Sequence, residues 1–185
     1  MKHGHTISPN KGSVMVIALI GRAGSGKSTI ASKLAKELGL EIISSDMLRD
    51  YIDAKLPGFE QLDIHIKQGE LPPADLVEKA LLFKIKNCKE QVGFIVDNVQ
   101  TYSQLFDKHL NIKHAFYLKL DESVADTRVK KRKREDLTLA FIQNRRHSFE
   151  NSIASTLTYF GNRVVEINAD TSPAQVVAQI KISLT

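Results

Sequence analysis

Short apolar runs alternate along the chain with longer amphipathic stretches. The runs that predict β-strands are 14–20, 41–44, 94–97, 114–120 and 163–168. The first of them is apolar at every position from Val14 to Ile20, which is typical of a strand buried on both faces of a sheet.

The stretches between these runs carry apolar residues three and four positions apart and predict helices. They cover 29–39, 46–54, 58–68, 75–90, 121–133 and 136–158, with a last helix opened by Ser172 and Pro173. Gly39 is a natural C-cap, and Asp121 is an acidic N-cap. Strands that alternate with helices indicate an α/β fold with a five-stranded parallel sheet flanked by helices in three layers.

Composition indicates how many domains the chain has, where it is located and which partners it favours. The 185 residues are 42% hydrophobic, which suits one domain, expected over 14–185 behind a disordered lead-in at 1–13. Cys88 is the sole cysteine and no apolar run reaches the length of a membrane span, so we expect a cytoplasmic protein without membrane contact. The net charge of +5 favours anionic partners, either phosphorylated small molecules or nucleic acid.

The segment from Gly21 to Ser28 decides between these partners. It fits G-x-x-x-x-G-K-[ST], the phosphate-binding loop of P-loop NTPases, and it stands between a predicted strand and a predicted helix. Its backbone N–H groups and the helix N-terminus would cradle phosphates, Lys27 would reach the β- and γ-phosphates, and the Ser28 hydroxyl would bind Mg²⁺. The predicted ATP-binding residues of this segment are Gly21, Ala23, Gly24, Ser25, Gly26, Lys27, Ser28 and Thr29.

From Val14 to its C-terminus the chain resembles the adenylate kinase family of nucleoside monophosphate kinases. Residues 42–49 are similar to the family's I-S-T-G-D-M-L-R segment at the entry to the acceptor site. The resemblance implies that Ser44 contacts the acceptor nucleoside, that Arg49 binds its phosphate and that Asp46 holds a water bound to Mg²⁺.

Two further segments, in the middle of the chain, also resemble segments of the adenylate kinase family. Residues 69–73 resemble G-x-L-V-P, which implies that Pro72 lines the acceptor base. Residues 93–97 are similar to the family's G-F-L-L-D strand, which implies that Asp97 is a catalytic carboxylate that holds Mg²⁺ through water. The resemblance also implies a mobile helical acceptor arm over about 46–90.

The arginines of the second half resemble those around the family's ATP lid. Arg128 would stack on adenine, Pro173 would belong to the loop that contacts adenine, and Arg132, Arg134 and Arg145 would be catalytic. Arg146 is the alternative to its neighbour Arg145. Arginine suits this work because the transition state of phosphoryl transfer spreads charge over several oxygens.

The chain departs from the family in two places. Gln100 stands where the family has an arginine that holds the acceptor phosphate, while Gln104 aligns with the glutamine that contacts the acceptor base. The lid is reduced to about 130–136, which predicts poorer exclusion of water and some hydrolysis of ATP without an acceptor.

We expect the chain to be a monomeric kinase that uses Mg²⁺ and moves the γ-phosphoryl group of ATP to a nucleoside monophosphate, with AMP foremost. Two alternatives stay open. The first is a P-loop kinase of a hydroxyl acceptor, such as a polynucleotide or a small metabolite, with Asp46 as general base. The second is a protein with degraded transfer chemistry, either a nucleotide-binding regulatory module or one that binds RNA through the basic run Lys130–Arg134. That run could also be a solvated helix face.

Overall fold

A computed structural model describes residues 14–44, 46–59, 65, 71–88, 93–97, 100–131 and 139–185. Its centre is a five-stranded sheet with the order β2-β3-β1-β4-β5. Every pair of neighbouring strands is parallel. The strands are β1 (Val16–Ile20), β2 (Glu41–Ile43), β3 (Phe94–Asp97), β4 (His114–Lys119) and β5 (Val164–Asn168). The predicted five-stranded parallel sheet and the P-loop α/β class are confirmed.

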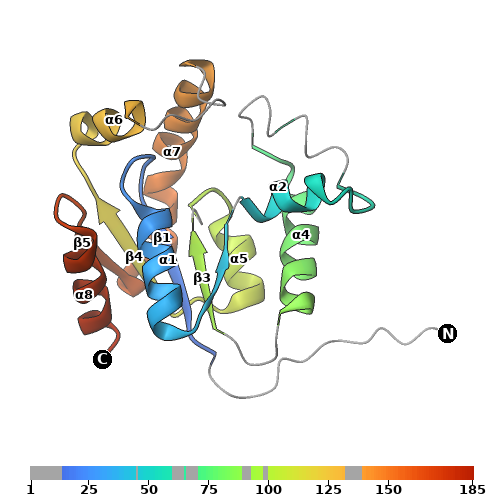
Figure 1. Cartoon of the computed structure of the whole chain (residues 1–185), viewed down its shortest axis with the longest axis horizontal. Helices are drawn as coiled ribbons and strands as arrows, with labels where there is room; N and C mark the ends of the chain where they lie inside the picture. Colours follow the sequence, from blue (N-terminus) through green and yellow to red (C-terminus); the bar gives the residue numbers. More distant parts are fainter. Residues whose placement is uncertain are drawn as a thin grey trace.

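The helices, labelled as in Figure 1, cover both faces of the sheet. They are α1 (Lys27–Leu38), α2 (Asp46–Asp53), α4 (Ala74–Asn87), α5 (Ser103–Leu110), α6 (Glu122–Lys130), α7 (Leu139–Phe160) and α8 (Pro173–Ser183), with short 3₁₀ turns η1 (Gln100–Tyr102) and η2 (Gly161–Arg163). None of the helices in the described part of the chain has the length and apolarity that a bilayer crossing requires.

The alternation of side chains along β1 builds two separate cores. Ile17 and Leu19 pack with α1 and α8 on one face, whereas Val16, Ala18 and Ile20 pack with α4, α5 and α7 on the other. All five side chains of β1 are buried, because β3 and β4 flank the strand and helices cover both of its faces. The burial predicted for both faces of this strand is confirmed.

One helix prediction needs correction, and one helix was missed. Gly58 and Phe59 were expected to open a helix over 58–68, but they lie in a turn and an irregular segment, and Gly58 has a left-handed φ of 86° that is incompatible with a helix. The rest of that prediction lies outside the described residues apart from His65. The helix α5 was not predicted, although Leu105, Phe106 and Leu110 give it an apolar face.

Candidate functional site

The phosphate-binding loop occupies the short connection between β1 and α1. Gly24 and Gly26 adopt φ angles of 86° and 93°, a region that favours glycine. A side chain at Gly24 would also collide with the carbonyl oxygen of Ala125 in α6. Gly26 is the N-cap residue of α1, so the loop delivers the chain directly into the helix. The N-terminus of α1, with its partial positive charge, therefore faces the loop.

The Lys27 side chain is buried in the loop. Its ammonium group donates hydrogen bonds to the carbonyl oxygens of Gly21 and of Arg22, the latter at 3.0 Å. The Ser25 amide donates to the same Arg22 oxygen at 3.2 Å. The Ser25 hydroxyl is buried and has no hydrogen-bond partner among the described residues. A fixed ammonium, a helix N-terminus and a buried hydroxyl together form a site for an anion such as a phosphate chain.

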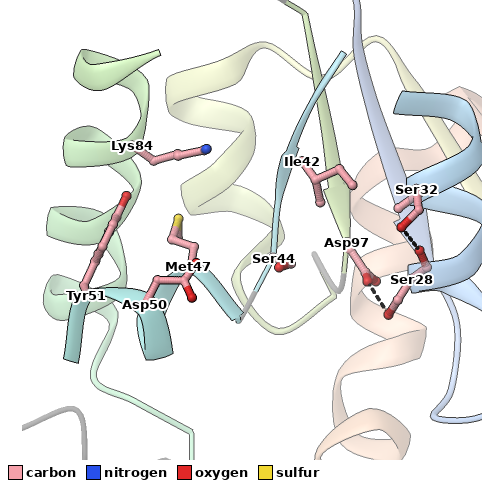
Figure 2. A pocket seen from close by; sticks show the side chains of 10 residues that line it. Ser28, Ser32, Ile42, Ser44, Met47, Asp50, Tyr51, Lys84 and Asp97 are labelled. Carbon is pink, nitrogen blue, oxygen red and sulfur yellow. Dashed lines mark hydrogen bonds between the residues drawn. The ribbon is translucent and has the colours of Figure 1, made fainter. Parts of the chain in front are cut away.

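Ser28 and Asp97 meet at the carboxyl edge of the sheet. The Ser28 hydroxyl donates a 2.8 Å hydrogen bond to one carboxylate oxygen of Asp97, as Figure 2 shows. The register of β1 against β3 pairs Asp97 with Leu19, which lies two residues before Gly21, the first residue of the loop. The other carboxylate oxygen of Asp97 is buried and has no partner among the described residues.

This pair fits Mg²⁺. Hydroxyl and carboxylate oxygens are the donors that Mg²⁺ prefers, and the ion usually keeps several waters and takes few protein ligands. In the described ranges no cluster of three or more His, Cys, Asp or Glu residues could hold a metal. A magnesium ion here would therefore depend on the Ser28 hydroxyl, on Asp97 through water and on the phosphates of its nucleotide.

A cavity of about 290 Å³ opens beside this pair. Ser28 and Asp97 lie on one side of it and Asp50, Tyr51 and Lys84 on the other (Figure 2). Its lining residues come from α1, β2, α2, α4 and β3, and are Ser28, Ala31, Ser32, Ile42, Ser44, Met47, Asp50, Tyr51, Lys84 and Asp97. A small molecule in the cavity would therefore lie against the end of the phosphate-binding loop.

Of the groups at the far side of the cavity, Lys84 is paired with a carboxylate and Tyr51 is neutral. The Lys84 ammonium lies 3.2 Å from the Glu41 carboxylate, so its charge is shared with the start of β2. Tyr51 packs its ring against Phe59 and Phe83, with ring centres 5.3 and 5.0 Å apart, and burial raises the pKa of its hydroxyl to about 12. The Tyr51 hydroxyl is therefore a neutral donor at working pH.

On the other side of the loop, Arg128 meets the connection between β5 and α8. Its guanidinium donates to the Ala169 carbonyl oxygen at 3.1 Å and to the Asp170 carboxylate at 3.2 Å. Pro173 begins α8 three residues later, behind a capping box formed by Ser172 and Gln175. The structure thus brings together the two segments that the resemblance assigns to adenine.

The remaining predicted acceptor residues lie in different surroundings. Ser44 lines the cavity, whereas Gln104 is exposed on α5 and is not among the lining residues. Gln100 is buried, and its backbone carbonyl oxygen accepts a 2.5 Å hydrogen bond from the Thr156 hydroxyl. The Pro72 carbonyl oxygen accepts from the Tyr102 hydroxyl.

Several predicted residues cannot be placed around the cavity. Residues 132–138, which include Arg132 and Arg134, lie outside the described residues, as do the side chains of Asp46, Arg49 and Arg145. Arg146, the alternative to Arg145, forms ion pairs with Glu122, Asp126 and Glu150. These contacts direct Arg146 toward α6, so its guanidinium is already engaged there.

Of the ten residues that line the cavity only Ser28, Ser44 and Asp97 were predicted, and Asp50, Tyr51 and Lys84 are among those that the sequence analysis missed. Asp50 and Tyr51 lie three and four positions after Met47, so the helical period of the predicted helix could have placed all three on one face. Lys84 had no such signal, because only the packing of α4 beside α2 brings it to the cavity.

Comparison with known proteins agrees with this geometry. A profile described as AAA domain matches residues 20–143, which is more than half of the chain and includes the loop, β3 and α6. The chain belongs to this AAA-domain family. The resemblance to adenylate kinases is confirmed at the level of the family.

Similar curated proteins include bacterial adenylate kinases. The adenylate kinase of Mycobacterium leprae is 26% identical over 174 residues, which cover 89% of this chain and 96% of that protein. That of Mycolicibacterium smegmatis is 28% identical over 164 residues, covering 84% and 91%. That of Mycobacterium tuberculosis is 26% identical over 174 residues, covering 89% and 96%. These matches support nucleotide phosphotransfer as the activity of the chain.

Proposed function

We propose that the chain transfers the γ-phosphoryl group of Mg·ATP to a nucleoside monophosphate, with AMP as the expected acceptor. The observation that carries this proposal is the Ser28–Asp97 pair, which joins the phosphate-binding loop to the cavity lined by Ser44. A γ-phosphate held by Lys27 and Ser28 would end where the cavity begins. An acceptor phosphate in the cavity would then need only to be positioned, since it is already ionised and requires no general base.

The size of the cavity supports a small acceptor. Sites for small molecules typically span about 300–1,000 Å³, and this cavity of about 290 Å³ lies at the lower end. Its lining combines apolar Ile42 and Met47 with the hydroxyl groups of Ser44 and Tyr51. This mixture suits the flat base and the sugar of one nucleotide.

Within this proposal the residues have separate tasks. Lys27 and the N-terminus of α1 hold the phosphates of ATP, while Arg128 and Pro173 flank its adenine. Ser28 binds Mg²⁺, and Asp97 and Asp46 hold its waters; when bound, the ion neutralises charge on the β- and γ-phosphates. Further predicted contacts with the transferred group and the acceptor are those of Arg49, Pro72, Gln100, Gln104, Arg132, Arg134 and Arg145.

The proposal includes the cellular location and the oligomeric state of the enzyme. The lone Cys88 and the absence of long apolar runs from the sequence favour the cytoplasm. A monomer suffices, because the loop and the cavity both belong to one chain.

A hydroxyl acceptor is the second candidate. Two observations favour it: uncharged Gln100 stands where the family holds the acceptor phosphate with arginine, and the carboxylate of Asp50 lines the cavity. Changing Asp46 to Asn separates the two candidates. A hydroxyl kinase that uses Asp46 as its base would lose nearly all turnover and still bind its acceptor.

The proposal is tested by measuring ADP release from Mg·ATP with AMP, CMP, UMP, GMP or dAMP, and with no acceptor. Strong stimulation by AMP would support it and would show that Gln100 is compatible with a phosphate acceptor. Stimulation by none of the five, above a steady rate without acceptor, would contradict it. The variant Lys181→Ala, which removes a surface ion pair with Glu37, is the matched control.

A further inference from the structure

Arg22 occupies a variable position of the phosphate-binding loop. Its side chain extends away from the loop and contacts two helices that are distant in the sequence, α6 and α7. We propose that Arg22 is a positioning residue that couples the loop to α6 and α7. The proposal concerns nucleotide binding and does not depend on which acceptor the enzyme uses.

The side chain of Arg22 has a partner in each helix. Its guanidinium lies 3.5 Å from the carboxylate of Glu122 in α6 and 5.7 Å from the ring centre of Phe149 in α7. The Arg22 side chain is 19% exposed, and Phe149 is buried. A guanidinium that is largely withdrawn from water between a carboxylate and an aromatic face has a fixed position.

The backbone of the same residue holds the Lys27 side chain. The Arg22 carbonyl oxygen accepts hydrogen bonds from the Lys27 ammonium and from the Ser25 amide. Because the side chain and the carbonyl share one Cα, an anchored guanidinium fixes the point from which Lys27 is held. A displacement of α6 or α7 would therefore move the Arg22 carbonyl oxygen and, with it, the Lys27 ammonium at the phosphate site.

The two helices are themselves joined through Glu122. Its carboxylate pairs with Arg146 of α7 as well as with Arg22, and Arg146 also lies 4.0 Å from Asp126 and 3.0 Å from Glu150. Helix α6 ends at Lys130 and α7 begins at Leu139. Glu122 thus ties the loop to the two helices that flank the segment expected to form the lid.

The close approach of the loop to α6 makes this coupling direct. Gly24 abuts the Ala125 carbonyl oxygen so closely that no side chain would fit there. The loop therefore cannot shift toward α6, and the Arg22–Glu122 contact opposes a shift away from it. Removing that contact is expected to loosen the loop and to weaken nucleotide binding about tenfold, within the range measured for coupled neighbouring residues.

The experiment measures Mg·ATP binding by titration calorimetry without acceptor, in the full chain and in five variants. Arg22→Ala and Glu122→Gln are each expected to bind about tenfold more weakly, and the double variant no more weakly than either, because both remove one shared contact. Arg22→Lys keeps the charge but not the planar group and is expected to fall in between. Lys181→Ala, which breaks the remote pair with Glu37, is expected to bind as the wild type does.

Two results would overturn the proposal. Binding by Arg22→Ala within twofold of the wild type would show that the anchor does not position the loop. Weaker binding by Arg22→Ala together with unchanged binding by Glu122→Gln would show that Arg22 contacts the nucleotide itself. Glu122→Gln conserves shape, so it keeps the test open if Arg22→Ala does not fold. Since no acceptor is present, failure here would leave the proposed reaction untouched.

Discussion

Asp97 is a buried carboxylate whose removal should separate function from stability. It is 8% exposed and accepts one hydrogen bond from the Ser28 hydroxyl at 2.8 Å, while its other oxygen is buried without a partner among the described residues. Asp97→Asn removes the charge and leaves an oxygen that can still accept from Ser28. We expect turnover to fall while the free energy of unfolding hardly changes.

The magnitudes follow from these contacts. A buried polar atom without a partner costs about 1–3 kcal/mol, and a hydrogen bond to a charged group contributes about 1.5–3 kcal/mol against about 1 kcal/mol for a neutral one. In Asp97→Asn an amide nitrogen takes the place of the unpartnered oxygen, so that cost remains. The weaker hydrogen bond from Ser28 is opposed by the relief of a buried charge, so the free energy of unfolding should stay within about 1 kcal/mol of the wild type. A carboxylate that orients the waters of a metal ion typically supports activity by 10- to 100-fold, and we expect a loss near the upper end, about 100-fold.

The assay combines guanidinium unfolding with turnover at saturating Mg·ATP and acceptor. Asp107 is the matched control, because it is also a mostly buried carboxylate but accepts hydrogen bonds from three donors outside the site. Asp107→Asn should lose stability and keep its turnover. If Asp97→Asn loses stability as Asp107→Asn does and turns over like the wild type, Asp97 is a structural residue and our reasoning is refuted.

Three further predictions concern stability and titration. Asp107→Asn weakens the ion pair with Arg163, measured at 2.9 Å, and should lower the free energy of unfolding by about 2 kcal/mol in guanidinium; an unchanged midpoint would contradict this. Ser172→Ala removes the N-cap of α8 and should lower the free energy of unfolding, measured by calorimetry, by about 1 kcal/mol. Ser172→Asp should restore most of this loss. An unaltered melting temperature in Ser172→Ala would show that the cap contributes nothing. Burial raises the pKa of Tyr102 to about 12, so the protonated form favours folding and its contribution is lost as pH rises toward 12. Tyr51 titrates in the same range, so in an absorbance titration Tyr102→Phe should lose one of two tyrosines from the component near pH 12, and an undiminished component would contradict the assignment.

Much of the fold could be predicted because its signals are local. The apolar run of β1, the left-handed Gly39 that ends α1 and the capping box at Ser172 each depend on a few neighbouring residues. The predicted helix over 58–68 was wrong at its start because the left-handed φ of Gly58 is set by the turn, not by the apolar pattern that follows it.

Some contacts of the candidate site could also be predicted from local sequence signals, and others could not. The contact between Ser28 and Asp97 could be anticipated, since the carboxyl ends of neighbouring parallel strands meet at one edge of the sheet. The place of Lys84 beside the cavity depends on how α4 packs, and the reach of Arg22 to Phe149 spans most of the chain. Such contacts carry no local signal, so only the structure reveals them.

The central claim is that the γ-phosphoryl group of ATP passes to a nucleotide held in the cavity beside Ser28 and Asp97. The most direct test follows that group, using ATP labelled at its γ-phosphorus together with AMP and separating the products. The account predicts that the label appears in the ADP formed from AMP, and that Lys27→Ala abolishes this transfer. Label found only in inorganic phosphate, at the same rate with and without AMP, would contradict it.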